Sequence, residues 1–236
     1  VSIISGGVVG LFLLIGRRTI VWSLAAALAC IVLTARRNLD YRTETTIWRD
    51  TVAKRPGNDR AHYNLGWSMP NHDPAALTAL KTALRLRSNY LEAHFNLANR
   101  LLHLARPAEA LFHFDESLRL KPGRPDIVHN RAQALAALGR IEEAIEQFEL
   151  VFRLSPTEAL GHVSLANILA AQKRVPEALE HYATALRLEP EGLEANFNLG
   201  TVLLHQGRPA DALPHFETAV RVDPKNTSAL LNLGVA

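Results

Sequence analysis

The feature that most constrains this chain is a self-similarity with a period of 34 residues, which runs from Asp59 to the end. Units with the same residue types at the same positions begin at Leu91, Pro125, Ala159, Leu193 and Thr227, and a unit of 32 residues begins at Asp59. Such a period is typical of arrays in which one supersecondary unit cannot bury its apolar face alone. The sequence therefore predicts that the units stack into an elongated rod in which each one contacts its neighbours.

Small, aromatic and proline residues recur inside the units and indicate two helices in each. Position 8 is always glycine or alanine, position 20 is alanine, position 24 is aromatic and position 32 is proline, as in Ala98, Ala110, Phe114 and Pro122. Small side chains let two helix backbones approach closely, the aromatic ring fills the space between hairpins, and proline stops the second helix. Each unit is therefore predicted to be a hairpin of two amphipathic helices, with glycine at the turn in two units, Gly139 and Gly207.

The run EALEHYATALRLEPEGLEANFNLGTVLLHQGRPADALPHFETAVRVDP, together with HYNLG in the first unit, resembles tetratricopeptide repeats over residues 59–236. The resemblance implies an all-α fold, a right-handed superhelical solenoid of helix hairpins. Its units are 59–90, 91–124, 125–158, 159–192 and 193–226, with a partial unit at 227–236. The sequence departs from the family's pattern in its short first unit, in Arg131 where leucine is usual, and in Ala105 and Lys173 where glycine is usual.

The first forty residues contain two apolar runs without a charge, at 1–16 and 19–35, bounded by pairs of arginines. A spanning helix needs about 17 to 25 apolar residues, and arginine side chains can reach the interface from its ends. Residues 1–37 are therefore predicted to be a transmembrane region that precedes the solenoid, with the end of one helix, a turn at 16–19 and a second helix at 19–35. A signal peptide explains two such runs in series less well, and an amphipathic surface helix fits poorly because neither run has a polar face.

Residues 38–58 are predicted to be a half-repeat junction helix, because Trp48 and Pro56 fall at the positions of the repeat's aromatic and proline. The junction resembles the C-terminal part of transmembrane and tetratricopeptide-repeat O-mannosyltransferases. That resemblance implies an integral membrane protein with its repeats on the periplasmic or lumenal side, although arginine pairs at both ends leave the orientation open from charge alone. The chain starts at Val1 and ends inside a unit, so we expect a fragment of a longer protein.

Charge and cysteine content narrow the function classes. Residues 1–58 contain eight basic and three acidic residues, whereas the remainder contains 18 basic and 20 acidic residues. The repeats are therefore not expected to bind nucleic acid, because phosphate binding needs a clustered positive face. Cys30 is the only cysteine of the sequence, so neither an intrachain disulfide nor a cysteine-based metal site is expected.

Asparagine recurs on the face of the first helix that is turned away from its hairpin partner. It occupies position 6 in every unit except the one with Ser164, and position 9 in two units; these residues are Asn64, Asn96, Asn130, Asn198 and Asn232, with Asn99 and Asn167. An amide has donors and an acceptor and can hold the backbone of an extended peptide. In the tetratricopeptide family the first helices line a concave groove, and the pattern resembles the asparagine ladder of the O-linked N-acetylglucosamine transferases. The alternative is that the asparagines bond to one another between neighbouring first helices.

The histidines recur at positions 4, 13 and 23, and their spacing argues against a metal site. Equivalent residues of adjacent units lie about 8–10 Å apart, too far to share zinc at roughly 2 Å per ligand. No glycine-rich phosphate loop or serine elbow is present, and the pair Glu142–Glu143 fits a solvated helix face. Neither a metal nor a cofactor is therefore expected, and the chain as given is predicted not to be an enzyme, whereas a longer protein could be a glycosyltransferase.

Two functions fit these observations. The first is a membrane-anchored repeat scaffold that binds protein or extended peptide segments through the asparagine-lined groove, with the lipid bilayer as its other partner. The second is the acceptor-recruiting region of a multi-spanning membrane glycosyltransferase of the O-mannosyltransferase kind. A purely structural role in assembly is a third reading.

Overall fold

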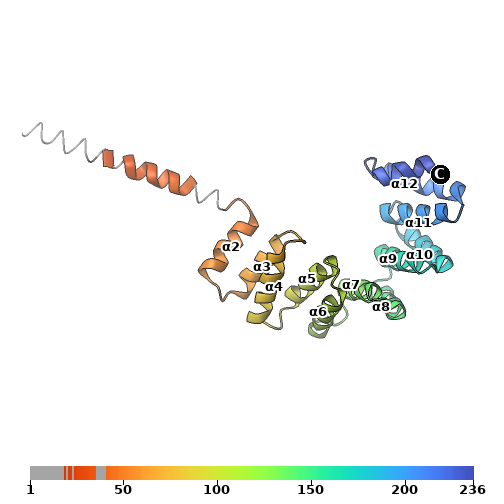
Figure 1. Cartoon of the computed structure of the whole chain (residues 1–236), viewed down its shortest axis with the longest axis horizontal. Coiled ribbons are helices and arrows are strands. Elements are labelled where there is room, and N and C mark those ends of the chain that lie inside the picture. The colour runs from red at the N-terminus through yellow and green to blue at the C-terminus, as the bar shows by residue number, and fades with distance from the viewer. Residues whose placement is uncertain (1–18, 20, 23, 36–40) are drawn as a thin grey trace, which may run out of the picture.

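The computed structural model describes residues 19, 21–22, 24–35 and 41–236 of the 236-residue chain. These residues form helices and connecting turns, and no strand occurs among them. Figure 1 shows successive helical hairpins that follow one another along a curved rod, from α2 to α13 at the C-terminus. The predicted all-helical solenoid of stacked hairpins is confirmed.

The helices of the rod alternate between first and second members of the hairpins. The first members are α3 (Asp59–Ser68), α5 (Leu91–His103), α7 (Pro125–Ala137), α9 (Ala159–Ala171), α11 (Leu193–His205) and α13 (Thr227–Val235). The second members are α4 (Pro74–Leu86), α6 (Pro107–Leu120), α8 (Ile141–Leu154), α10 (Val175–Leu188) and α12 (Pro209–Val222), and α2 (Glu44–Lys54) precedes the first hairpin.

Packing runs between the members of a hairpin, between each second helix and the next hairpin, and between first helices of adjacent hairpins such as α5 and α7. The aromatic residues at position 24 are fully buried, as in Phe114, Phe148 and Phe216. Gly200 at position 8 shows why small residues recur there, because an added Cβ atom would lie 2.9 Å from Cε1 of Phe216. A methyl group cannot fit at that distance without a shift of the ring or the helix.

The hairpin turns keep the same geometry where the expected glycine is missing. Ala105 and Lys173 have φ values of 54° and 62°, beside 77° for Gly139 and 72° for Gly207. Each of these residues ends a first helix in the left-handed conformation, followed by a bond such as that from the N–H of Arg106 to the carbonyl of Leu101, 2.8 Å long. The two departures from glycine, at Ala105 and Lys173, therefore cost local strain and leave the fold unchanged.

The helix α2 packs against α3 at the start of the rod. Trp48 and Val52 lie against the cluster of Leu65, Met69 and Ala76, and the hydroxyl of Thr45 donates to the carbonyl of Ser68. The assignment of residues 38–58 to a half-repeat stays a prediction, and residues 38–40 lie outside the described part of the chain.

The predicted transmembrane region is wrong for the residues that the structure describes. The predicted first run at 1–16 and most of the turn at 16–19 lie outside the described residues. No described helix combines the length and the apolar character that a crossing requires. The predicted integral-membrane localisation, with repeats on a periplasmic or lumenal side, is corrected accordingly.

Candidate protein-interaction groove

The seven predicted asparagines all lie on first helices, and each is partly exposed. Three of them, Asn96, Asn99 and Asn130, line one cavity of about 420 Å³ together with Trp67, Arg100, His103 and Gln133. Asn167 lines a second cavity of about 340 Å³. Gln133 lines both, so the two cavities are neighbours along the first helices. Asn64, Asn198 and Asn232 line neither of these two cavities.

The asparagine amides also bond between neighbouring first helices, as in the alternative reading of the sequence. The Nδ2 of Asn130 donates to Oδ1 of Asn99 at 2.8 Å, and Nδ2 of Asn198 donates to Oδ1 of Asn167 at 2.9 Å. These bonds join position 6 of one unit to position 9 of the unit before it. Gln133 and Ser164 form the corresponding contact at 3.5 Å, so Ser164 continues the same pairing without an asparagine.

The ladder leaves hydrogen-bonding capacity unused. Asn96 donates from Nδ2 to the hydroxyl of Tyr63 at 2.9 Å, and neither its Oδ1 nor that of Asn130 or Asn198 has a hydrogen-bond partner among the described residues. Each of these amides therefore keeps an acceptor and one N–H for a ligand, while its other N–H fixes its orientation. The two readings of the sequence are compatible, because one side chain can do both.

Arg100 is a structural residue of this region that the sequence reading missed. Its side chain is only 5% exposed, and its guanidinium donates to the carbonyls of Gly66, Met69 and Pro70 at 2.6–2.7 Å. Burial lowers the pKa of Arg100. These carbonyls belong to the end of α3 and the turn that follows, where the first unit is two residues short, so the guanidinium supplies the bonds that a longer helix would make. The signal was present, because position 10 is apolar in the later full units, as in Ala134, Ile168 and Val202.

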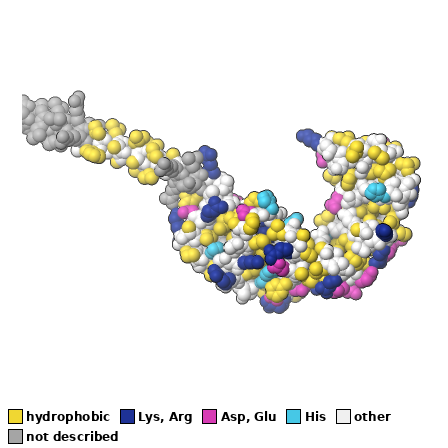
Figure 2. Space-filling view, in the orientation of Figure 1, with side chains coloured by type: hydrophobic (Ala, Val, Ile, Leu, Met, Phe, Trp, Pro, Cys, Tyr) yellow, Lys and Arg dark blue, Asp and Glu magenta, His cyan; other side chains and the backbone are white. Residues whose placement is uncertain are grey.

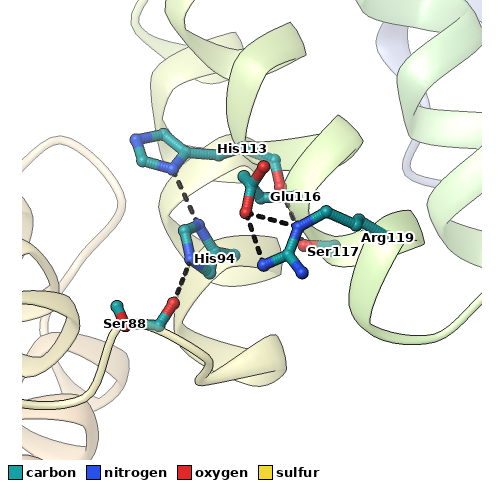
Figure 3. Close-up of polar contacts among 6 residues, drawn as sticks. All are labelled: Ser88, His94, His113, Glu116, Ser117 and Arg119. Carbon is teal, nitrogen blue, oxygen red and sulfur yellow. Dashed lines mark hydrogen bonds and ion pairs between the residues drawn. The ribbon is translucent and has the colours of Figure 1, made fainter.

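The histidines pair within units rather than between them. Figure 3 shows His94 on α5 facing His113 on α6, with their Nδ1 atoms 2.9 Å apart, and His162 and His181 form the same contact at 3.0 Å. Histidines at one shared position do not reveal this pairing, because position 4 meets position 23 of the same unit. No group of three or more metal-type ligands occurs in the described part of the chain.

The surroundings of His94 determine where its proton lies. Its Nε2 is 2.9 Å from the carbonyl oxygen of Ser88, which can only accept, so the neutral ring carries its proton there. The Nδ1 of His94 then accepts the N–H of His113. In a later unit Asn196 replaces the first histidine, donating to the carbonyl of Pro190 at 3.0 Å and accepting from Nδ1 of His215 at 3.0 Å.

Burial, and then the neighbouring histidine, lower the pKa of His113 and of His162 to about 4. The rings are therefore neutral near pH 7 and act as neutral links between the two helices of a hairpin. The adjacent carboxylate, Glu116, bonds to Arg119 (Figure 3). The arrangement is a structural contact without the features of a catalytic dyad.

Charged groups are mixed over the molecule. Figure 2 shows basic and acidic side chains interspersed along the curved rod, which leaves its inner side open between the two ends. Ion pairs such as Arg140–Glu143 and Arg174–Glu177 connect residues three apart at the start of second helices. These exposed pairs contribute little to stability.

Comparison with protein-family models assigns the chain to a family. Models of the tetratricopeptide repeat match residues 91–124, 129–191, 163–226 and 197–236, which together cover more than half of the chain. The chain belongs to the tetratricopeptide-repeat family. The hairpins, the small residues at the helix contacts and the buried aromatic residues described above are those of tetratricopeptide repeats.

Among curated proteins, the chain is similar to Protein O-mannosyl-transferase Tmtc3 of Drosophila melanogaster, with 33% identity over 92 residues. The match covers 36% of this chain and 10% of that protein, so the matched segment is about a tenth of the relative's length. This is the kind of relative that the junction suggested.

Solved tetratricopeptide-repeat structures resemble the chain in fold. The protein TTC0263 of Thermus thermophilus has a TM-score of 0.63 at 22% identity, and the match covers 75% of this chain and 98% of that one. YrrB, described as a tetratricopeptide-repeat protein with an unusual peptide-binding site, has a TM-score of 0.54 at 20% identity, and its match covers 78% and 96%.

Proposed function

We propose that this tetratricopeptide-repeat chain is a protein-binding scaffold that holds extended protein segments in the groove along its first helices. The observation that carries the proposal is a pair of cavities that share Gln133, with Asn96 and Asn130 in the first cavity each keeping an unused acceptor. The side-chain amides of Asn96 and Asn130 are held in place by hydrogen bonds from their Nδ2 atoms to the preceding first helix, so they are pre-organised for a ligand.

The chemistry fits a peptide backbone better than a particular side chain. A backbone offers one N–H and one C=O per residue, and each asparagine amide can accept from the first and donate to the second. Neighbouring first helices are spaced about 8–10 Å apart, close to the length of three extended residues. One repeat would therefore contact the backbone about once every three residues, largely independent of sequence.

Peptides selected from a displayed random library on the immobilised chain provide the test. Binding of the selected peptides is measured by calorimetry for the natural chain and for the triple variant Asn96→Ala, Asn130→Ala and Asn198→Ala. We expect a loss of about tenfold or more in affinity, because several hydrogen bonds of roughly 0.5–1.5 kcal/mol each are removed. Circular dichroism checks that the variant keeps its helix content.

A matched control carries alanine at three hydroxyls of the second helices, Thr78, Thr184 and Thr218, which bond to carbonyls of their own helices. This control should bind the peptides as the natural chain does. Equal binding by the asparagine variant would show that the groove amides do not hold the ligand.

A second function rests on the similarity to Protein O-mannosyl-transferase Tmtc3. In it, the chain is the part of a larger glycosyltransferase that recruits the acceptor protein, and the groove holds the acceptor segment. Sequencing the coding region on both sides of the chain tests this: a glycosyltransferase domain in the same reading frame would support it. A complete reading frame that encodes repeats without such a domain would rule it out.

A further inference from the structure

The second cavity has both apolar and polar lining residues. We call its apolar lining residues Ala136, Ile141, Ile168 and Ala171, from α7, α8 and α9, the floor; Asn167 and the carboxylate of Glu194 are among its polar lining residues. An aliphatic chain that ends in a charged group matches such a surface, because it buries its methylene groups while its head stays at the polar residues.

The carboxylate of Glu194 has no cationic partner among the described residues, and its side chain is exposed. Some other carboxylates of the same region are paired, as Glu177 is with Arg174 and Glu191 with Arg221. The charge of Glu194 acts on the neighbouring core residue Tyr182, whose pKa is raised by burial first and by Glu194 second. A carboxylate without a counter-ion at the edge of a groove favours a cation there.

Hydrogen bonds hold Glu194 in position. Asn167 accepts at Oδ1 from the hydroxyl of Tyr182 at 2.5 Å and from Nδ2 of Asn198 at 2.9 Å. Both donors point at the oxygen, so the Nδ2 of Asn167 faces the other way and donates to Oε1 of Glu194 at 3.2 Å. Asn167 is thus a positioning residue that aims the carboxylate, and one oxygen of Glu194 stays free for a ligand.

We propose that this cavity receives a basic side chain, lysine or arginine, of the extended segment held in the groove. The aliphatic stem lies on Ala136, Ile141 and Ile168, and the cationic head meets Glu194. The inference rests on the proposed function, because it assigns one side-chain pocket of the same groove. A pocket for a basic side chain gives the groove a sequence preference, whereas contacts to the peptide backbone alone do not depend on sequence.

Other side chains fit the cavity less well. An apolar side chain would cover the floor, but it would displace water from the carboxylate of Glu194 and offer no hydrogen bond or positive charge in return. An acidic side chain would place two negative charges together. A small side chain would leave the apolar floor exposed to water.

The test uses peptides selected on the immobilised chain, resynthesised as arrays in which each position in turn carries lysine, leucine or glutamate. We expect one position at which lysine binds about fivefold more tightly than leucine, the size of a favourable but partly exposed ion pair. The preference should shrink in 0.5 M salt, because the charges are screened.

The variant Glu194→Gln keeps the shape of the side chain and should bind the lysine and leucine peptides equally. Glu194→Lys should reverse the preference toward glutamate at that position. The control Glu191→Gln changes an exposed carboxylate of the inter-repeat turn that is paired with Arg221, and it should keep the lysine preference.

The outcomes separate this inference from the proposed function. Peptides that bind through the asparagines but show no lysine preference, or one that Glu194→Gln leaves intact, would overturn the basic pocket while the groove stands. If every selected peptide binds the triple asparagine variant as tightly as the natural chain, both the groove and the basic pocket are overturned.

Discussion

We expect the paired histidines to make this tetratricopeptide-repeat array sensitive to acid, and an asparagine in one of its own repeats suggests a change that reduces this sensitivity. The perturbation is the double variant His94→Asn and His162→Asn. It copies Asn196, which donates to the carbonyl of Pro190 and accepts from His215. An asparagine at position 94 can bond to Ser88 and His113 in the same way, and it carries no charge at any pH.

The pKa values of His113 and His162 give the direction and size of the effect. In each the pKa falls from 6.5 to about 4, first through burial and then through the facing histidine. Between these values the unfolded chain binds protons that the folded chain excludes, so stability falls as the pH falls from 6.5 toward 4. The full shift is worth roughly 3 kcal/mol per group, and partial solvent exposure reduces this to about 1–2 kcal/mol.

The assay is urea unfolding, followed by circular dichroism at several values between pH 7.5 and 4.5. We expect the natural chain to lose stability across this range and the double variant to lose roughly half as much of the histidine-linked part, because burial of the remaining rings persists. The control His72→Asn and His205→Asn changes two exposed histidines and should follow the natural chain. An unchanged pH dependence in the double variant would refute the reasoning.

Two further changes test the packing of the array. Arg100→Met should lower the free energy of unfolding by about 3 kcal/mol and speed hydrogen exchange in α3, because three carbonyls lose a charged donor. The control Arg106→Met, at an exposed arginine, should cost under about 0.5 kcal/mol, and similar costs for the two variants would show that the Arg100 guanidinium does not cap α3. Gly200→Ala should lower the free energy of unfolding by about 1 kcal/mol in thermal or urea unfolding, because crowding of the new methyl group against Phe216 exceeds the gain in helix propensity. At Gly234 an added Cβ atom meets nothing within 4 Å, so Gly234→Ala should be neutral or stabilising, and equal effects of the two variants would contradict the packing argument.

The repeat architecture was predictable because periodicity reports directly on packing. Residues that meet between hairpins must be small or aromatic in every unit, so Gly200, Phe114 and their equivalents mark the helix contacts in the sequence alone. The turn geometry at Ala105 and Lys173 could not be predicted from these residue types, because both adopt the left-handed conformation that usually takes glycine.

The predicted membrane span failed because it rested on apolar composition over the whole run at 19–35. Hydropathy sums residues, whereas a crossing requires one continuous helix of sufficient length. Among the described residues, no helix is both long and apolar enough for a crossing.

The candidate site was predicted in part. The asparagines lie on first helices as expected, but the partner of each amide depends on the neighbouring unit, so the bond from Asn130 to Asn99 could be named only as an alternative. The contact between His94 and His113 joins two different repeat positions, and Arg100 compensates for missing residues elsewhere. A comparison of like positions along the sequence does not detect such contacts.

The most direct test of the groove is a nuclear magnetic resonance titration of asparagine-labelled chain with a selected peptide, read at the side-chain amide signals. The account predicts that the signals of Asn96, Asn130 and Asn167 move, while those of Asn58 and Asn226, which cap α3 and α13, stay in place. Movement confined to the capping asparagines, or none at the groove amides while the peptide binds, would contradict it.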